Sequence, residues 1–432
     1  MKIIKKYNLK SYYLGDNNPK IFYGLPKEIK FCLNCSYSNQ KPNSEQEYKH
    51  SISKKKPLIK FDEQNICSAC KISNYKKEID WKTREKELIE LCNKYRKNNG
   101  EYDCIVPGSG GKDSMFASYI LKYKYKMNPL TVTWSPHIYT EWGKKNFYNW
   151  IASGFDNYLF TPNTKVQRLL TRLSMENIFH PFQPFMMGQM YFPPKIAIKL
   201  NIKLVFYGEN PTDYGNQSKE DKTSKKNLDY FSVKNTEDIF ISGLKINELK
   251  KYGLNKNDLS NYFPPKIEDL KKKKIDVRYL GYFIKWEPQK NFYFVSENCN
   301  FLPAPERSVG TYSKYSSIDD KMDDLHYYTT YIKFGIGRAT YDTAQEIRNG
   351  QLTRDEGVKL VRKYDGEYPF RFEKELFEYL SIDENTFGKI SKKFKDPIFD
   401  RDYLEILTNK FRSPHLWYFD KKHKKFILRK SI

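Results

Sequence analysis

Short apolar runs alternate with longer amphipathic segments through residues 102–207. The runs have the length of buried strands, and the segments between them repeat their apolar positions with the period of a helix. Such alternation is typical of a parallel sheet with helices on both faces and a ligand at the carboxyl ends of the strands. The predicted strands are 102–106, 129–134, 157–160 and 203–207, and the predicted helices are 114–126, 141–154, 165–177 and one that begins near Gly188.

The chain around this α/β core has a different pattern. Its 432 residues are too many for a single hydrophobic core. Residues 217–275 are polar and Lys-rich, and we interpret them as a partly helical insertion with mobile parts, before a strand-like segment at 276–286. The predicted units are an N-terminal unit at 1–98 that ends in a connecting helix from Trp81 to Asn98, the α/β domain at 99–300, and a mainly helical C-terminal lobe for substrate or partner at 301–432.

A glycine-rich turn, Pro107–Ser114 with the sequence PGSGGKDS, joins the first predicted strand to the first predicted helix. Glycines let the backbone approach an oxyanion, and the N–H groups and dipole at a helix start attract negative charge. Ser109 and Ser114 can add hydroxyl donors, and Lys112 adds a positive charge. The turn therefore predicts a phosphate site, although many such turns only link a strand to a helix.

This turn is not the mononucleotide P-loop, because Val106 stands where that motif needs its first glycine and Asp113 follows Lys112. Residues Ser109–Ser114 instead resemble the SGGxDS signature of the ATP pyrophosphatases, the PP-loop family. The resemblance implies an adenine nucleotide alpha-hydrolase-like α/β domain whose loop binds the pyrophosphate of ATP. The nucleotide-binding candidates are Ser109, Gly110, Gly111, Lys112, Asp113, Ser114 and Gly208, with Thr133 and Trp134 where an adenine could be held; Trp134 could equally be core.

Two carboxylates follow the fourth predicted strand. Glu209 comes directly after Gly208 at its end, and Asp213 lies four residues further on. The carboxyl ends of parallel strands share one edge of the sheet, so these side chains are expected beside the glycine turn. Mg²⁺ favours a few carboxylate oxygens together with phosphate oxygens, which makes Glu209 and Asp213 candidate Mg²⁺ ligands. An acidic loop that caps the next segment is the alternative.

Four of the seven cysteines form two CxxC pairs, Cys32/Cys35 and Cys67/Cys70. Four thiolates close a tetrahedral shell, as in structural zinc sites, so we expect an N-terminal zinc ribbon, with redox or iron–sulfur use as the alternative. The spacer between the pairs is polar and is interpreted as a surface excursion. Cys92, Cys104 and Cys299 are most simply core thiols.

The formal net charge of +24 suits nucleic acid, anionic sugars, nucleotides or an acidic partner. The excess is mostly lysine, which is more typical of a solvated surface than of a binding groove, so nucleic acid is not favoured. No apolar run is long enough to span a bilayer, and the first residues lack a signal-peptide core. We therefore expect a cytoplasmic protein without a membrane partner.

Further motifs follow in order: PFQPF at 181–185 with GQ at 188–189, FYGEN at 206–210, YSKYSSIDDK at 312–321 and KFGIGRA at 333–339. With both CxxC pairs and PGSGGKDS, this order closely resembles the N-acetyl sugar amidotransferase family of bacterial surface-polysaccharide (LPS O-antigen) and flagellar-glycan biosynthesis. The resemblance implies ATP-dependent conversion of a sugar acetamido group to an acetamidino group. It also implies ammonia from a glutaminase subunit and a channel subunit that resemble the halves of imidazole glycerol phosphate synthase.

The same motifs supply candidate contacts to an N-acetylated sugar or nucleotide sugar. They are Gln183, Gln189, Lys314, Lys333 and Arg338, of which the three basic residues could equally form salt bridges within the lobe. Thr212 and Asp213 stand where the family pattern has an acidic pair, so Glu209 is the better supported of the two carboxylates.

The chemistry is consistent with an ATP pyrophosphatase loop. An amide oxygen leaves poorly, but attack of that oxygen on the α-phosphate of ATP gives an O-adenylyl imidate from which ammonia can displace AMP. The catalytic candidates are Lys112, Asp113, Ser114 and Glu209, which with Mg²⁺ would stabilise the departing pyrophosphate. No glutaminase nucleophile is recognisable, so ammonia is expected from a partner.

Two other functions share parts of this pattern. A PP-loop tRNA-modifying enzyme, of the thiolation or lysidine type, has the same loop and a basic charge. Sulfur insertion, however, generally needs cysteines near the site, and only Cys299 follows the loop. A non-catalytic zinc-ribbon scaffold that binds nucleotide to regulate an assembly is the third possibility.

Overall fold

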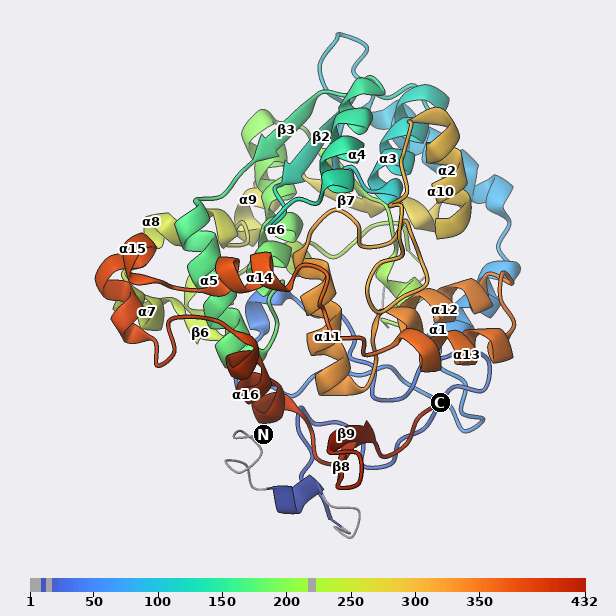
Figure 1. Cartoon of the computed structure of the whole chain (residues 1–432). Coiled ribbons are helices and arrows are strands. Elements are labelled where there is room, and N and C mark those ends of the chain that lie inside the picture. The colour runs from blue at the N-terminus through green and yellow to red at the C-terminus, as the bar shows by residue number, and fades with distance from the viewer. Residues whose placement is uncertain (1–8, 13–17, 217–222) are drawn as a thin grey trace.

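The computed structural model describes residues 9–12, 18–216 and 223–432 (Figure 1). The first residues, expected to lack a signal peptide, and residues 217–222, the beginning of the predicted insertion, lie outside the described residues. Within the described parts of the chain, every helix is too short or too polar to cross a membrane.

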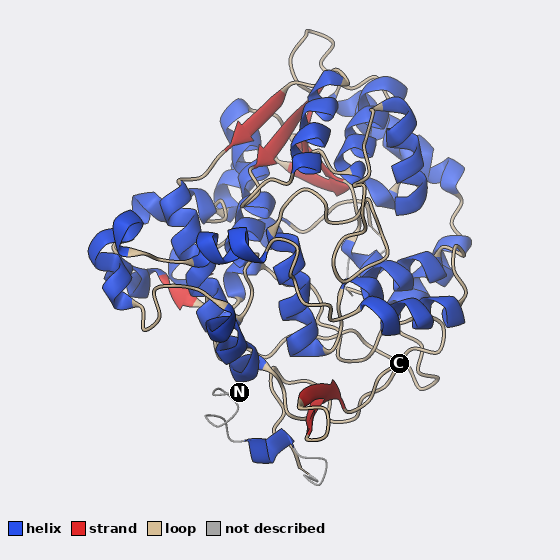
Figure 2. Ribbon diagram, viewed as in Figure 1, coloured by secondary structure: helices blue, strands red, loops and turns tan. Residues whose placement is uncertain are grey.

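Five parallel strands form the central sheet in the order β3-β2-β1-β4-β7 (Figures 1 and 2). The fold class expected from the alternation of strands and helices is confirmed. In the register, Val106 of β1 pairs with Thr131 of β2, and Ile105 pairs with Val205 of β4. The strands are β1 Cys104–Pro107, β2 Pro129–Trp134, β3 Asn157–Phe160, β4 Leu204–Tyr207 and β7 Asp276–Tyr279.

Alternate side chains of β1 point to opposite faces of the sheet and enter different cores. Ile105 packs in the cluster that contains α5 Thr164–Ile178 and α6 Gln183–Leu200. Cys104 and Val106 pack in the cluster built by α2 Trp81–Tyr95 and α3 Lys112–Tyr119. Helices therefore cover both faces of the sheet, which leaves the carboxyl ends of the strands as the place where loops and ligands can meet.

The remaining elements flank this core (Figure 1). Before β1 lie η2 Leu9–Tyr12, η3 Glu47–Lys49 and α1 Ser68–Lys77; after α3 come the π-helical turn η4 Ile120–Lys124 and α4 Glu141–Ala152. Between β4 and β7 lie η5 Pro211–Tyr214, η6 Leu228–Phe231, η7 Thr236–Asp238, β5 Phe240–Ile241, β6 Leu244–Lys245, α7 Ile246–Leu249, η8 Lys250–Tyr252, α8 Lys256–Leu259, η9 Ser260–Tyr262 and α9 Ile267–Lys272. After β7 follow η10 Leu280–Tyr282, α10 Pro288–Asn298, α11 Met322–Phe334, α12 Arg338–Arg348, α13 Arg354–Tyr364, α14 Glu373–Leu380, α15 Glu384–Phe387, η11 Gly388–Lys393, α16 Arg401–Phe411 and the hairpin β8 Trp417–Asp420 with β9 Lys425–Leu428.

The segment between β4 and β7 is more closely integrated than its composition indicates. Phe231, Leu249, Leu259 and Tyr262 are buried and belong to the same core as Ile105. The lysines of this segment give it a polar average, but many of its widely spaced apolar residues are buried in this core. The expected strand at 276–286 is also shorter than predicted, since β7 ends at Tyr279.

The N-terminal and C-terminal parts of the chain pack against each other. The Ser36 hydroxyl lies 2.8 Å from that of Thr343 in α12, and the Arg354 guanidinium donates to the Cys32 carbonyl oxygen. The hairpin of β8 and β9 lies near η2 at the bottom of Figure 1. The two terminal parts of the chain are therefore held together by direct contacts.

Candidate active site

The glycine-rich turn follows β1 and opens α3. Gly110 has φ +89°, and a Cβ there would lie 2.6 Å from the Phe147 Cα, so only glycine fits. A Cβ at Gly108 would lie 2.1 Å from the Ser114 Cβ, which means that glycine also lets the helix start lie against the strand end. The first N–H groups of α3 have no acceptor within the helix and are available to an anion.

The turn lies where the sheet order reverses. The chain runs outward from β1 to β2 and β3, and then returns to place β4 on the other side of β1. Loops after β1 and β4 diverge at such a point and leave a crevice between them. Gly208 and Glu209 follow β4, so the sequence-predicted loop and the sequence-predicted carboxylate meet in this crevice.

Two adjoining cavities occupy the crevice, with volumes of about 540 and 330 Å³. Because the two cavities share part of their walls, a molecule in one can contact a molecule in the other. The residues that line both are Gly111, Asp113, Met186, Gln189 and Glu209.

The smaller cavity combines the glycine turn with apolar and aromatic side chains. Ser109 and Ser114 lie at one end, and Met190, Tyr207 and Phe231 form other parts of the wall. An aromatic and thioether wall suits a flat heterocycle, and the helix start beside it suits phosphate. This cavity has the composition expected for a nucleotide.

The larger cavity is rich in charge. Asp319, Asp323 and Asp342 line it together with Arg338 and His326. The acidic residues come from the YSKYSSIDDK motif and from α11 and α12, and none of these carboxylates is among the candidates named from the sequence. The signal that could have identified them is the cluster of Asp residues just before and within the start of a helix.

Three buried carboxylates of the cavity walls, those of Glu209, Asp319 and Asp323, have raised pKa values. Burial raises the pKa of Glu209 to about 7, and the negative charge of Asp113 adds to the increase. Burial also raises the pKa of Asp319, and it raises that of Asp323 well above its usual value with help from Asp319 and Asp320. This concentration of acid groups with few cations favours a bound divalent cation.

The polar groups of the turn have protein partners. The Lys112 ammonium lies 2.6 Å from the Asp113 carboxylate. The Ser109 hydroxyl donates to Asp319 over 2.6 Å, and the Ser114 hydroxyl donates to the Gly111 carbonyl oxygen over 2.9 Å. The bond from Ser109 joins the turn after β1 directly to the acidic segment before α11.

Three predicted residues lie away from the cavities. Thr133 is fully buried and accepts a hydrogen bond from Asn157, and Trp134 packs against Phe160 with its ring centroid at 4.8 Å. Gln183 is fully buried and donates to the Glu47 carbonyl oxygen. These side chains build the core, because β2 is covered on both faces and α6 begins earlier than Gly188.

The other predicted contact residues lie in different parts of the structure. Asp213 pairs with Lys76 over 2.5 Å and lines a different cavity, so it does not join Glu209. Lys314 donates to the Pro305 carbonyl oxygen, and the buried Lys333 donates to that of Ile178. Arg338 and Gln189 line the larger cavity, with Arg338 held 3.0 Å from Asp342.

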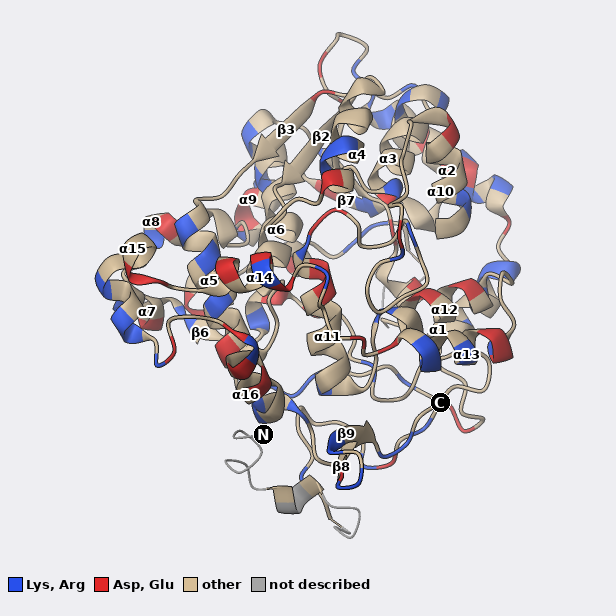
Figure 3. Cartoon of the chain, in the orientation of Figure 1, with Lys and Arg blue, Asp and Glu red and all other residues tan. Residues whose placement is uncertain are grey.

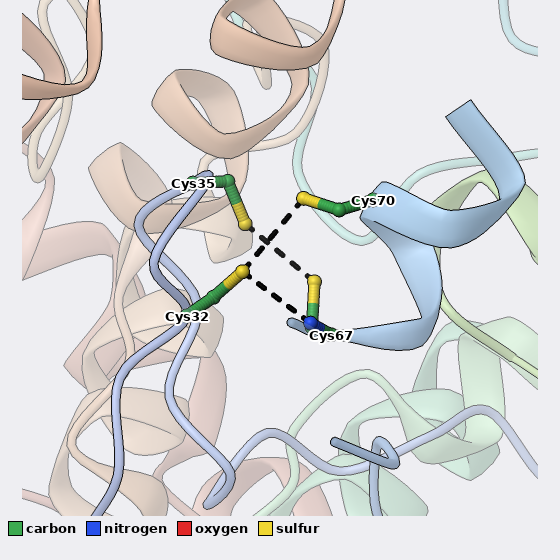
Figure 4. Close-up of side chains that lie close together, drawn as sticks. All are labelled: Cys32, Cys35, Cys67 and Cys70. Atoms are coloured by element: carbon green, nitrogen blue, oxygen red, sulfur yellow. Dashed lines mark hydrogen bonds between the residues drawn. The ribbon is translucent and has the colours of Figure 1, made fainter. Parts of the chain in front are cut away.

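The four CxxC cysteines meet at one buried point (Figure 4). Sγ–Sγ distances of 3.8 Å for Cys32 and Cys70 and of 3.6 Å for Cys35 and Cys67 match the separation of about 3.8 Å expected for thiolates 2.3 Å from a tetrahedral ion. The charged groups of Lys41 and Arg348 act on the cluster and offset thiolate charge. The cluster therefore fits a metal such as zinc, although the same donors also suit iron.

One protein family, one relative and one solved structure show similarity to this chain. Residues 309–429 match the family described as LPS biosynthesis protein WbpG-like, C-terminal domain. An 80-residue stretch is 39% identical to the uncharacterized protein MJ1599 of Methanocaldococcus jannaschii, and the match spans 18% of this chain and 28% of that relative. The U34-tRNA thiolase NcsA of Methanococcus maripaludis, solved with its [4Fe-4S] cluster, aligns over 78% of this chain and 89% of its own with 11% identity and a TM-score of 0.26.

The region matched by the LPS biosynthesis family has a clear place in the site. It supplies Asp319, Asp323, His326, Arg338 and Asp342, which line the larger cavity. The part of the chain that is similar to a lipopolysaccharide biosynthesis domain thus forms the charged wall that faces the glycine turn.

Proposed function

We propose that this protein is an ATP-dependent amidotransferase that converts the acetamido group of a sugar to an acetamidino group. The observation that carries the proposal is the pair of adjoining cavities on either side of the glycine turn. One has the composition of a nucleotide site, and the other is walled by the region similar to a lipopolysaccharide biosynthesis domain. Two substrates bound there would meet at the shared wall.

In the proposed reaction the acetamido oxygen attacks the α-phosphate of ATP, and pyrophosphate leaves. The resulting O-adenylyl imidate then reacts with ammonia, which forms the C–N bond of the amidine as the C–O bond to AMP breaks. The N–H groups at the start of α3, the hydroxyls of Ser109 and Ser114 and the ammonium of Lys112 would stabilise the pyrophosphate as its charge develops.

Glu209 and Asp113 are the residues that would hold Mg²⁺, because both line both cavities and the charge of Asp113 helps to raise the pKa of Glu209. When bound there, Mg²⁺ supplies positive charge to the phosphates. Asp213 is left out of this set because its carboxylate pairs with Lys76 in another cavity.

Ammonia is proposed to come from a partner glutaminase through a channel subunit. The chain alone is expected to use ammonium ions but not glutamine. Incubation of candidate acetamido sugars with ATP, Mg²⁺ and ammonium, followed by mass spectrometry, tests the proposal. Replacement of one oxygen by NH with release of AMP and pyrophosphate supports the proposed reaction. Turnover of glutamine by this chain alone contradicts the proposal that a partner glutaminase supplies the ammonia.

A tRNA substrate is the competing function, and the site does not favour it. Within the described residues neither cavity has a cysteine in its wall, and Cys299 is buried beside Phe155 and Val295. Basic side chains are spread over the molecule among acidic ones (Figure 3). A gel shift with tRNA that persists at physiological salt would favour tRNA, because binding by charge alone weakens steeply as salt rises.

A further inference from the structure

A second group of metal-binding side chains lies in the spacer between the two CxxC pairs. The sequence interpretation of this spacer was a surface excursion, but Glu47 and His50 are only 3% and 7% exposed. Glu47 opens the 3₁₀ helix η3 Glu47–Lys49, and His50 caps its end. Side chains three residues apart lie on the same side of a 3₁₀ helix, so both point to one place.

His180 joins these two side chains from another part of the chain. It follows Phe179, whose left-handed backbone with φ 48° ends α5 and reverses the chain. The Glu47 Oε2 atom lies 3.3 Å from His50 Nδ1 and 3.6 Å from His180 Nε2, and the three potential ligand atoms all lie within 4.8 Å of one another.

These nitrogen–oxygen distances are longer than those of hydrogen bonds but shorter than those between groups that do not interact. An N–H···O bond would bring nitrogen and oxygen to about 2.7–3.2 Å. Nitrogen and oxygen ligands about 2.0–2.1 Å from a tetrahedral ion are instead about 3.3 Å apart. Glu47 Oε2 and His50 Nδ1 are also buried without a hydrogen-bond partner in the described chain, which is costly unless a further group binds them.

We propose that Glu47, His50 and His180 bind a divalent transition-metal ion of the Zn²⁺ class. One carboxylate and two imidazoles are a common donor set for such ions, and three protein ligands leave one coordination position for water. This site is separate from the four-cysteine cluster in its residues and its donor atoms. It does not depend on the proposed amidotransferase function.

Positive charge near the cluster opposes a cation and limits the expected affinity. The Lys56 and Lys333 side chains act on both His50 and His180, and Lys54, which is paired with Glu45, also acts on His50. Binding must therefore come from direct coordination and not from long-range attraction. Without an ion, the same lysines would be the main charge partners of Glu47.

The site would fix a wall of the larger cavity. The His180 ring stacks on the His326 ring with centroids 5.2 Å apart, and His326 lines the cavity. Gln183, at the start of α6, donates to the Glu47 carbonyl oxygen over 2.9 Å. A metal ion at Glu47 would therefore join the spacer, the end of α5 and the start of α6 behind the cavity.

The test is the metal content of the full chain after equilibration with Zn²⁺ and desalting, measured for zinc and iron together. We expect His50→Ala and His180→Ala each to lose one zinc equivalent relative to wild type. His326→Gln is the matched control, because His326 stacks on the cluster but offers no ligand atom to it. It should keep the wild-type content. Equal content in wild type and both ligand variants would overturn the proposal.

A second measurement uses the wild-type chain and does not depend on the variants folding. Co²⁺ added to the protein after its four-cysteine site has been filled should give a visible spectrum of nitrogen and oxygen ligands without thiolate charge-transfer bands. The absence of any protein-bound Co²⁺ beyond the four-cysteine site would overturn the proposal.

Discussion

The two cavities beside the glycine turn differ in what lines them. The smaller one is bounded by Met190, Tyr207 and Phe231, and the larger one by Asp319, Asp323 and Arg338. The lining of the smaller cavity suits a flat apolar group next to a helix start, and the larger cavity presents charged side chains that need partners. The difference teaches that one turn can border two cavities of unlike chemistry, which under the proposed function would receive the nucleotide and the sugar.

Glu209 belongs to the shared wall, so its replacement is expected to have the largest effect. Glu209→Gln should lower the rate of AMP formation about 10²-fold or more, the size usual for loss of a group that stabilises transition-state charge. Asp213→Asn is the matched control, because Asp213 lines another cavity and should leave the rate nearly unchanged. Equal losses in both variants would contradict the separation of these two carboxylates.

Arg338 tests the larger cavity alone. Arg338→Lys keeps the charge but loses the planar fork, and it should raise the KM for the sugar about tenfold, as expected for loss of a charge-assisted hydrogen bond. The KM for ATP should stay the same. Lys314→Ala should change neither constant, because the Lys314 side chain lines neither cavity and donates to the Pro305 carbonyl oxygen. A rise in the KM for ATP in Arg338→Lys would mean that the larger cavity also receives the nucleotide.

Met190 tests the smaller cavity alone. Met190→Trp fills space beside the glycine turn, and overpacking of about 1 kcal/mol or more should raise the KM for ATP about fivefold. Steady-state kinetics should show an unchanged KM for the sugar. An effect on the sugar without one on ATP would reverse the assignment of the two cavities.

A separate prediction concerns pH and the stability of the Mg²⁺-free protein. Because burial raises the pKa of Glu209 from 4.5 to about 7, the folded state binds this proton more tightly than the unfolded state does. The free energy of unfolding should therefore fall as pH rises from 4.5 to 7, and the loss should persist above 7. Glu209→Gln should remove this contribution, seen as a pH-dependent difference in Tm between the variant and wild type.

The strands of the sheet were predictable, because each is a short and mostly apolar run between segments of helical period. Strands β2 and β3 have the predicted bounds, and the turn from Gly108 to Ser114 lies where its glycines indicate. The packing of the predicted insertion into the main core was not predictable, since its buried residues, such as Phe231 and Leu259, are too widely spaced to give a periodic signal.

The candidate site likewise contains residues that were predictable from the sequence and residues that were not. Glu209 was predictable because it directly follows a strand, whereas Asp213 failed to join it because η5 turns the chain toward Lys76. The contacts of Ser109 with Asp319 and of Glu47 with His180 connect residues more than a hundred positions apart. No local pattern encodes such contacts, since they depend on how separate segments pack.

The central claim is that an acetamido oxygen in the larger cavity captures the α-phosphate of ATP held at the turn after β1. Isotope transfer tests it most directly: the chain is incubated with ATP, Mg²⁺, ammonium and an acetamido sugar labelled with ¹⁸O in its carbonyl group. The account predicts that the AMP formed carries the ¹⁸O label while the sugar gains nitrogen. Unlabelled AMP, or label retained in the sugar product, would contradict it.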